Sequence, residues 1–327
     1  MAEGLPVAVI TGALGSGKTT LLRKLLAHPG MGETAVLVNE LGEVGIDHHL
    51  LRQVDERTVL LASGCLCCTM RGDLADELRE LLSRRDRGDV PPFERVVVET
   101  TGLAEPAPIL HTLLAEPVVK HHFVLETVVA TVDAQHGLAR PEAVRQAAAA
   151  DTLVVTKADA AGPDEVVALE RELGRLNPLA QILEVSFGDV DPARLFAGAS
   201  RGRSRDPTSL RLLRSEGSGE NENHSHQDVE AFALAVDGEL DWAAFGVWLT
   251  MLLQSRGADV LRVKGLLNVG AAGPVLLNGV QHVVHPPEHL DSWPDGDRRS
   301  RLVFIARGIG RAEVEASLTA FQRAARS

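Results

Sequence analysis

The feature that most constrains this sequence is a glycine-rich segment near its start, TGALGSGKTT, from Thr11 to Thr20. It matches the pattern G-x-x-x-x-G-K-[ST], follows the apolar run PVAVI, and opens the helical run KTTLLRKLLA. A strand, a glycine-rich loop and a helix in this order direct backbone N–H groups and a helix N-terminus at phosphate. A simple glycine-rich turn is the weaker alternative, and the segment predicts a phosphate-binding loop.

The residue types of this loop suit a nucleoside triphosphate. The glycines let the backbone curl around the phosphates, Lys18 reaches the β- and γ-phosphates, and the Thr19 hydroxyl binds Mg²⁺. We expect the Lys18 ammonium to contact only solvent when no nucleotide is bound, and to act in catalysis when one is. The predicted nucleotide-binding residues of the loop are Gly12, Gly15, Ser16, Gly17, Lys18, Thr19 and Thr20.

The pattern of apolar runs predicts an α/β fold. Short Val-rich runs such as TAVLVNE, FERVVVET and TLVVTKAD alternate with amphipathic runs such as GDLADELRELLSRR over residues 5–198, which is typical of a mostly parallel sheet covered on both faces. We predict a P-loop NTPase domain at 1–198, a Ser-, Gly- and Arg-rich flexible linker at 199–228, and a smaller α+β domain at 229–327.

Two later segments fit the same nucleotide site. Glu99, in FERVVVETTG, ends a strand that we expect beside the phosphate loop, where its carboxylate would hold Mg²⁺ and serve catalysis. Without the phosphate loop, Glu99 would be an ordinary acidic residue at a strand end. Gly102 in the same segment would let the backbone approach the γ-phosphate.

The segment TKAD, Thr156 to Asp159, follows the run TLVV and is predicted to read the base. A carboxylate at Asp159 can accept from guanine N1–H and from the 2-amino group, a donor pair that adenine lacks. We expect the Lys157 stem to lie along the base. Thr156, Lys157 and Asp159 are therefore predicted nucleotide-binding residues that favour GTP.

Three cysteines, Cys65, Cys67 and Cys68, are the only ones in the chain and lie within four positions in SGCLCCTMRGD. They cannot all pair with one another, and cytosolic thiols stay reduced, so a structural disulfide is a poor explanation. Thiolates suit tetrahedral Zn²⁺ or Co²⁺, and we favour metal binding over redox sensing. Glu40 is a candidate for a further ligand, with a surface salt bridge as its alternative.

Composition excludes several classes of partner. The net charge is −12 with no basic tract, which argues against nucleic acid held through phosphate contacts. No apolar run is long enough to span a bilayer and the first residues lack the features of a signal peptide, so we expect a cytoplasmic protein without membrane attachment. Most histidines, including His121 and His122, have no spacing typical of metal ligands; whether His224 and His226 bind metal stays open.

The motifs GALGSGKTT, NELGEVGID, GCLCC, ETTGLAEP and TKAD, followed by LRVKGLLNV and SRLVFIARG, resemble the CobW-type GTPases, a group with nitrile hydratase activators and zinc-regulated metallochaperones. The resemblance covers nearly the whole chain. The family usually has Asn where this chain has Thr156, so the base pocket lacks one amide contact.

The resemblance implies a GTPase that uses Mg²⁺ with GTP and delivers Zn²⁺ or Co²⁺ to a client metalloprotein. A nucleotide-dependent homodimer is a further expectation. Two alternatives remain: a P-loop kinase acting on a small molecule, against which TKAD and the cysteines weigh, and a metal buffer that nucleotide only stabilises.

Overall fold

The structure is a computed structural model that describes residues 4–38, 59–62, 70–196, 228–270 and 273–326. Contacts between Cα atoms divide the chain into two compact units, one of Met1–Gly174 with Ala180–Arg205 and one of Arg175–Leu179 with Asp206–Ser327. Within the described residues no helix has the length and apolarity that a membrane crossing requires. The predicted linker falls almost wholly outside these residues, so its bounds stay a prediction.

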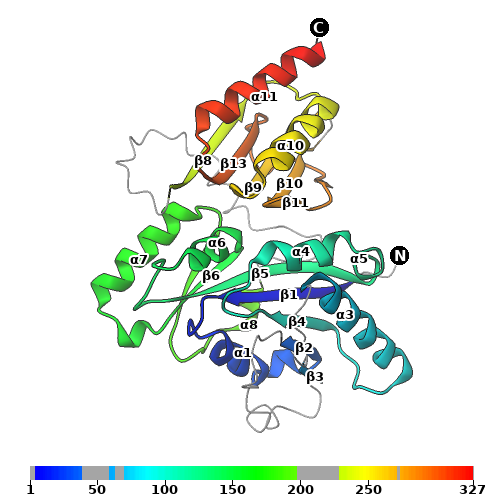
Figure 1. The fold of residues 1–327 in the computed structure, drawn as a ribbon, viewed down its shortest axis with the longest axis vertical. Helices are drawn as coiled ribbons and strands as arrows, with labels where there is room; N and C mark the ends of the chain where they lie inside the picture. Colours follow the sequence, from blue (N-terminus) through cyan, green and yellow to red (C-terminus); the bar gives the residue numbers. More distant parts are fainter. Residues whose placement is uncertain (1–3, 39–58, 63–69, 197–227, 271–272, 327) are drawn as a thin grey trace. The chain divides into compact units, whose positions relative to one another are not determined.

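The described part of the first unit contains a seven-stranded sheet in the order β3-β2-β4-β1-β5-β6-β7 (Figure 1). Every neighbouring pair in it is parallel, which confirms the predicted α/β fold. The strands are β1 (Leu5–Gly12), β2 (Thr34–Val38), β3 (Val59–Ala62), β4 (Arg95–Glu99), β5 (Phe123–Asp133), β6 (Thr152–Thr156) and β7 (Gln181–Val185).

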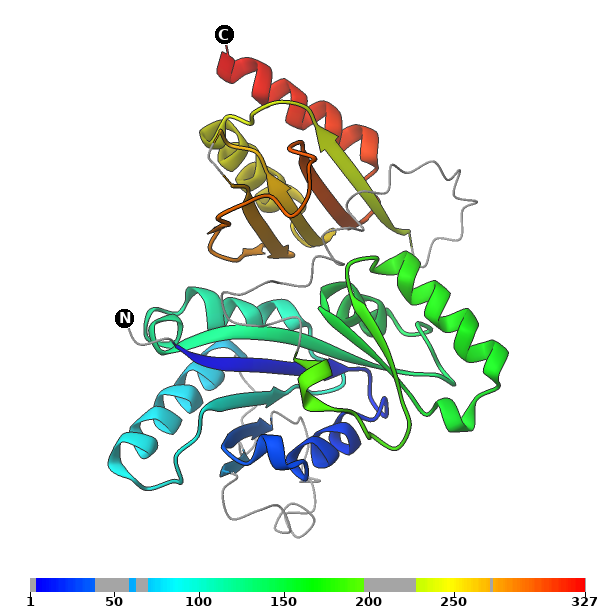
Figure 2. The same ribbon diagram turned by 180° about the vertical axis from the view of Figure 1, so that it is seen from behind.

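Helices cover both faces of this sheet because its central strands are apolar on both sides. Helices α1 and α8 pack on one face, whereas α4 and α6 lie on the other (Figures 1 and 2). The helices are α1 (Lys18–Leu26), α3 (Met70–Arg87), α4 (Pro106–Ala115), α5 (Pro117–His122), α6 (Pro141–Ala149), α7 (Pro163–Leu176) and α8 (Pro192–Leu195), with short 3-10 turns η1 (Pro29–Met31) and η2 (Ala158–Ala160).

The register of the central strands determines where the functional side chains meet. Ile10 of β1 lies opposite Glu99 of β4, and Gly12 lies opposite Thr131 of β5. Because these strands are parallel, their carboxyl ends lie at the same edge of the sheet, where ligands of open α/β sheets bind. The phosphate loop follows β1 at that edge.

The second unit is a mainly antiparallel sheet in the order β11-β10-β9-β13-β8, with β12 paired to β10. Helices α10 and α11 pack on one face around Trp248 and Phe304, which confirms the predicted α+β domain. Its elements are β8 (Val229–Val236), α10 (Trp242–Arg256), β9 (Val260–Leu267), β10 (Val275–Val280), β11 (Val283–Val284), β12 (Glu288–His289), β13 (Ser300–Arg307) and α11 (Arg311–Arg326).

One segment of this unit folds back on itself. GPVLLNGVQHVVH forms the hairpin β10–β11, because Gln281 adopts a φ of 50° and reverses the chain.

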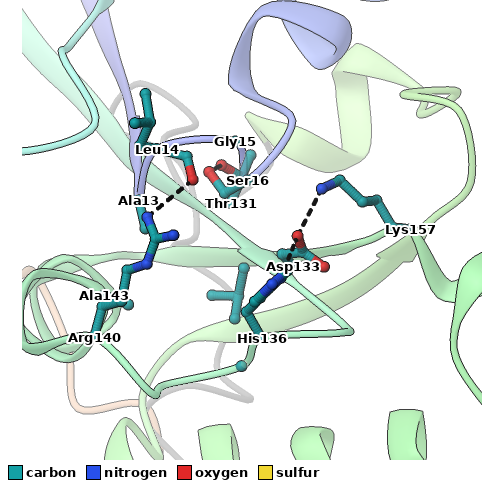
Figure 3. A pocket seen from close by; sticks show the side chains of 12 residues that line it. Ala13, Leu14, Gly15, Ser16, Thr131, Asp133, His136, Arg140, Ala143 and Lys157 are labelled. Atoms are coloured by element: carbon teal, nitrogen blue, oxygen red, sulfur yellow. Dashed lines mark hydrogen bonds and ion pairs between the residues drawn. The ribbon is translucent and has the colours of Figure 1, made fainter.

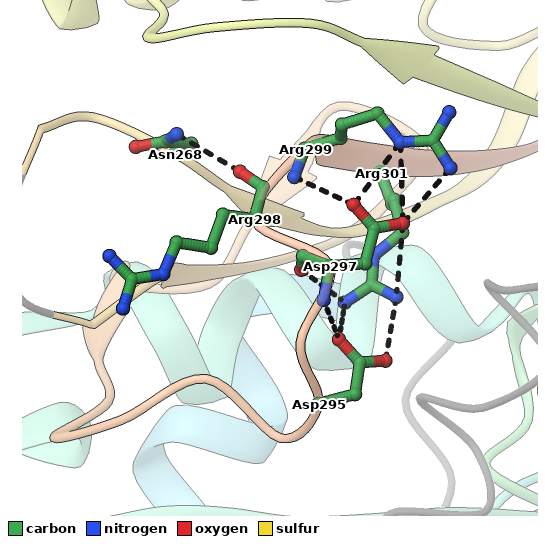
Figure 4. A network of polar contacts seen from close by, with 6 residues as sticks. All are labelled: Asn268, Asp295, Asp297, Arg298, Arg299 and Arg301. Atoms are coloured by element: carbon green, nitrogen blue, oxygen red, sulfur yellow. Dashed lines mark hydrogen bonds and ion pairs between the residues drawn. The ribbon is translucent and has the colours of Figure 1, made fainter.

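A carboxylate network supports the neighbouring loop (Figure 4). Asp295 accepts two hydrogen bonds from Arg301, at 2.9 and 3.2 Å, while the guanidinium of Arg299 lies 3.0 Å from Asp297. The buried Arg301 is therefore held by a two-point contact.

Candidate functional site

The phosphate loop leaves β1 at Gly12 and enters α1 at Lys18. Gly17 is the N-cap of α1 and has a φ of 93°, a left-handed conformation that a residue with a side chain adopts only with strain. The Lys18 ammonium is buried and donates to the carbonyls of Gly12 at 2.8 Å and Ala13 at 3.0 Å. The expectation that it contacts only solvent is wrong, because the curled loop presents its own carbonyls to the ammonium.

Thr19 and Glu99 meet at the edge of the sheet although 80 residues separate them. The Thr19 hydroxyl donates to Glu99 Oε1 at 2.7 Å, and the Glu99 side chain is 1% exposed at the end of β4. Both predicted Mg²⁺ ligands are thus oxygen atoms that converge beside the phosphate loop. Their hard oxygen donors fit Mg²⁺, which binds through one or two protein oxygens together with phosphates and water.

The remaining loop residues surround this pair. Gly15 and Thr20 are exposed, at the outside of the loop and in the first turn of α1, whereas Ser16 is buried. The Ser16 hydroxyl lies 2.6 Å from the Thr131 hydroxyl of β5. The loop is therefore tied to β5 on the side away from Glu99.

The turn that follows β4 lies against the phosphate loop. Thr100 donates its N–H to Ile10 O at 2.9 Å and its hydroxyl to Thr11 Oγ1 at 2.9 Å. A Cβ atom on Gly102 would lie 2.6 Å from the N and Cα atoms of Leu14. Glycine is therefore required at 102, because a side chain there would collide with the backbone of Leu14.

Thr156 connects the predicted base-reading segment to the phosphate loop. It is buried at the end of β6, and its hydroxyl donates to Ser16 O at 2.7 Å with Val132 O at 3.3 Å. The hydroxyl thus helps to hold the phosphate loop in place. The consequence of Thr in place of Asn for base contact stays a prediction.

Lys157 and Asp133 form an ion pair at the margin of the loop (Figure 3). Lys157 has a φ of 56°, and its Nζ lies 2.6 Å from Asp133 Oδ2, which also contacts His136 Nδ1 at 3.1 Å. Burial would raise the pKa of Asp133, but hydrogen bonds from Lys157, the N–H of Gln135 and His136 together hold it below its ordinary value. The carboxylate is therefore charged.

A cavity of about 230 Å³ opens between this ion pair and the phosphate loop. Its walls are Gly15, Ser16, Thr131, Asp133 and Lys157 together with residues of the β5–α6 connection. Asp133 was not singled out from the sequence, although VVATVD placed an acidic residue at the end of a strand, as FERVVVET did for Glu99.

Asp159 lies in η2 and is exposed. Among the described residues, no hydrogen bond or ion pair engages its carboxylate. This is the arrangement that a carboxylate needs if it is to accept both donors of a guanine edge.

The predicted transfer-metal ligands lie outside the described residues: Cys65, Cys67, Cys68 and Glu40. The cysteines follow β3, the edge strand of the sheet, and Glu40 follows β2, which lies between β3 and β4. In the part of the chain that the structure describes, no cluster of three or more His, Cys, Asp or Glu side chains could hold a metal ion.

The fold and the geometry of this site define a P-loop nucleotide-binding protein. The family model "CobW/HypB/UreG, nucleotide-binding domain" matches residues 6–184, and the model "Cobalamin synthesis protein cobW C-terminal domain" matches residues 229–322. The chain belongs to the CobW family.

Relatives match this chain over most of their length. The zinc chaperone YjiA of Escherichia coli is 31% identical over 324 residues, covering 98% of this chain and 99% of that protein. The zinc chaperone CobW of Pseudomonas aeruginosa is 31% identical over 351 aligned positions, covering 95% and 89%. The crystal structure of Zn(II)-bound YjiA GTPase from E. coli superposes with a TM-score of 0.71 at 26% identity, covering 98% and 99%. The similarity therefore includes both units.

Proposed function

We propose that this protein is a cytoplasmic, GTP-hydrolysing metallochaperone that takes up Zn²⁺ or Co²⁺ and delivers it to a client protein. The observation that carries the proposal is the convergence of Lys18, Thr19 and Glu99 at one edge of the sheet, in a chain whose full-length relatives are named zinc chaperones. GTPase activity is supported by the name of the solved neighbour.

Hydrolysis is a water attack on the γ-phosphorus that breaks its bond to the β–γ bridging oxygen and yields GDP and phosphate. On nucleotide binding, the Lys18 ammonium exchanges the carbonyls of Gly12 and Ala13 for β- and γ-phosphate oxygens, where it stabilises negative charge. Thr19 and Glu99 would hold Mg²⁺, which supplies further charge neutralisation when bound. Asp159 selects guanine, and Lys157 flanks the base.

The transferred metal is the cargo, and we assign it to Cys65, Cys67 and Cys68 with Glu40 as a further ligand. Three thiolates with a carboxylate make a tetrahedral set suited to Zn²⁺ or Co²⁺. Directional transfer requires different metal affinity in the GTP and GDP states, since equal affinity shifts no equilibrium. A nucleotide-dependent homodimer is part of the proposal.

The test is a metal titration of reduced protein under anaerobic conditions, with GDP and with a non-hydrolysable GTP analogue. We expect about one metal ion per chain. The affinity for the metal should differ roughly 5- to 150-fold between the protein with GDP and the protein with the GTP analogue. Cys67→Ala and Cys68→Ala should lower the stoichiometry, whereas His121→Ala should leave it unchanged. If the titration curves with GDP and with the analogue coincide, metal affinity does not depend on the nucleotide, and only a static metal site remains.

Product analysis separates the three classes of function. Stoichiometric phosphate release from GTP, accelerated or slowed by Zn²⁺ or Co²⁺, supports the metallochaperone. A phosphorylated small molecule would support a kinase instead, and metal binding without turnover would support a buffer.

A further inference from the structure

Gln146 of α6 forms an unusual contact with the turn that follows β4. Its side chain is 1% exposed, and the Nε2 amide donates to Gly102 O at 3.2 Å and to Ala104 O at 3.0 Å. Its Oε1 atom is buried with no hydrogen-bond partner among the described residues. Both hydrogen bonds of this side chain therefore go to carbonyl groups of the turn.

The turn that Gln146 holds lies against the phosphate loop. Its ends are joined by a hydrogen bond from Ala104 N to Thr101 O at 3.1 Å, and Gly102 touches the backbone of Leu14. A buried carbonyl without a partner is costly, so two such carbonyls bound by one amide strongly favour this conformation. Movement of Gly102 away from the loop would weaken the hydrogen bond from Gln146 to Gly102 O.

Other contacts of α6 reach the same two segments from the surface. Arg140 donates to Leu14 O at 3.3 Å, and Arg145 pairs with Glu105 at 3.0 Å (Figure 3 shows Arg140). The Arg140 hydrogen bond is exposed and the Arg145–Glu105 ion pair is partly exposed, and contacts at the surface contribute little. Gln146 is the buried contact by which α6 determines the distance between the turn and the loop.

We propose that Gln146 is a positioning residue for γ-phosphate recognition, holding Gly102 where its backbone meets the terminal phosphate of GTP. This inference rests on the proposed GTPase function and deepens it. GDP has no γ-phosphate, so loss of the Gln146 amide weakens GTP binding and turnover while leaving GDP binding unchanged.

The test compares Gln146→Met with Gln322→Met. Methionine keeps the length of the side chain and removes both N–H donors. Gln322 is a matched control, because it is buried in the second unit and binds both backbone groups of Asp241, at 2.8 and 3.2 Å. Affinities for GDP and a non-hydrolysable GTP analogue are measured by calorimetry, with kcat and KM for GTP.

For Gln146→Met we expect affinity for the analogue to fall about tenfold, as two neutral hydrogen bonds allow, with affinity for GDP within about twofold of the parent. Gln322→Met should change neither affinity. Equal losses for both nucleotides, or no loss for either, would show that Gln146 is only part of the packing. Absence of GTP binding in the parent protein would instead overturn the proposed function, and this inference with it.

The variant Gln146→Glu is a second, independent test, and it can be used even if Gln146→Met does not fold. A carboxylate has no donor for the two carbonyls, whereas a protonated carboxyl group donates one hydrogen bond. Discrimination between the analogue and GDP should therefore recover partly as the pH falls, relative to the parent at each pH. A constant ratio across the pH range would contradict the positioning role.

Discussion

The hydroxyl of Thr19 donates to the carboxylate of Glu99 at 2.7 Å, and this contact joins the first turn of α1 to the end of β4. Glu99 lies opposite Ile10 in the parallel register of β1 and β4. The order of these strands therefore places its carboxylate near the first turn of α1. The contact brings together, beside the phosphate loop, the two oxygen atoms that we propose as Mg²⁺ ligands.

Replacing the Glu99 carboxylate tests its role toward Mg²⁺. Glu99→Gln keeps an acceptor for Thr19 and removes the charge. We expect this variant still to bind nucleotide but to bind Mg²⁺ poorly, so that GTP turnover falls by about 10². A Mg²⁺ titration of turnover measures this. Glu126→Gln is the control, because Glu126 is a similarly buried carboxylate that pairs with Arg95 at 2.9 Å. Equal Mg²⁺ dependence in all three proteins would exclude Glu99 as a ligand.

Removing the Lys18 ammonium should weaken nucleotide binding without unfolding the chain. A charge-assisted contact with phosphate is strong, so Lys18→Ala should lower GTP affinity about tenfold or more. The loop also loses the contacts to Gly12 and Ala13, so a small decrease in melting temperature is expected. Lys24→Ala, an exposed lysine of the same helix, is the control. Unchanged GTP affinity in Lys18→Ala would remove this residue from the site.

The architecture could be predicted because it depends on local patterns. Apolar runs alternating with amphipathic runs specify buried parallel strands and covering helices, and the glycine-rich segment places the loop. Glu99 could be predicted as well, since a residue that ends a strand beside β1 must lie near that loop.

The resting contacts of individual side chains could not be predicted. Lys18 binds loop carbonyls, Lys157 pairs with Asp133, and Gln146 binds a turn more than 40 residues away. Each contact depends on how the strands and helices pack in three dimensions, which periodicity does not specify. Thr156 shows the same limit, because the sequence pattern did not indicate that its hydroxyl donates to Ser16 O of the loop.

We expect base selection to depend on Asp159. GTP should bind about 10² more tightly than ATP, because adenine leaves the carboxylate without its donor pair. Asp159→Asn replaces one acceptor by a donor and should reduce this preference, whereas Asp164→Asn, exposed at the start of α7, should not. Competition between GTP and ATP in a binding assay measures the ratio. Comparable affinity for GTP and ATP in the parent would argue against the base-reading role and favour a kinase.

The pair of Asp295 and Arg301 should dominate the stability of the loop before β13. The Arg301 side chain is 3% exposed and that of Asp295 is 12% exposed, so Asp295→Asn removes the nearer counter-charge of a buried guanidinium and leaves only Asp297, whose Oδ2 lies 4.0 Å away. Breaking such a pair costs about 3 kcal/mol or more.

The exposed pair of Arg311 and Glu315 in α11 is the control, with side chains 53% and 54% exposed, and Glu315→Gln should cost less than about 1 kcal/mol. All three tryptophans, Trp242, Trp248 and Trp293, belong to the second unit, so tryptophan fluorescence during urea unfolding reports on that unit. The midpoint should fall clearly in Asp295→Asn alone. A midpoint equal to that of the parent would mean that solvent or other groups compensate Arg301 as well as Asp295 does.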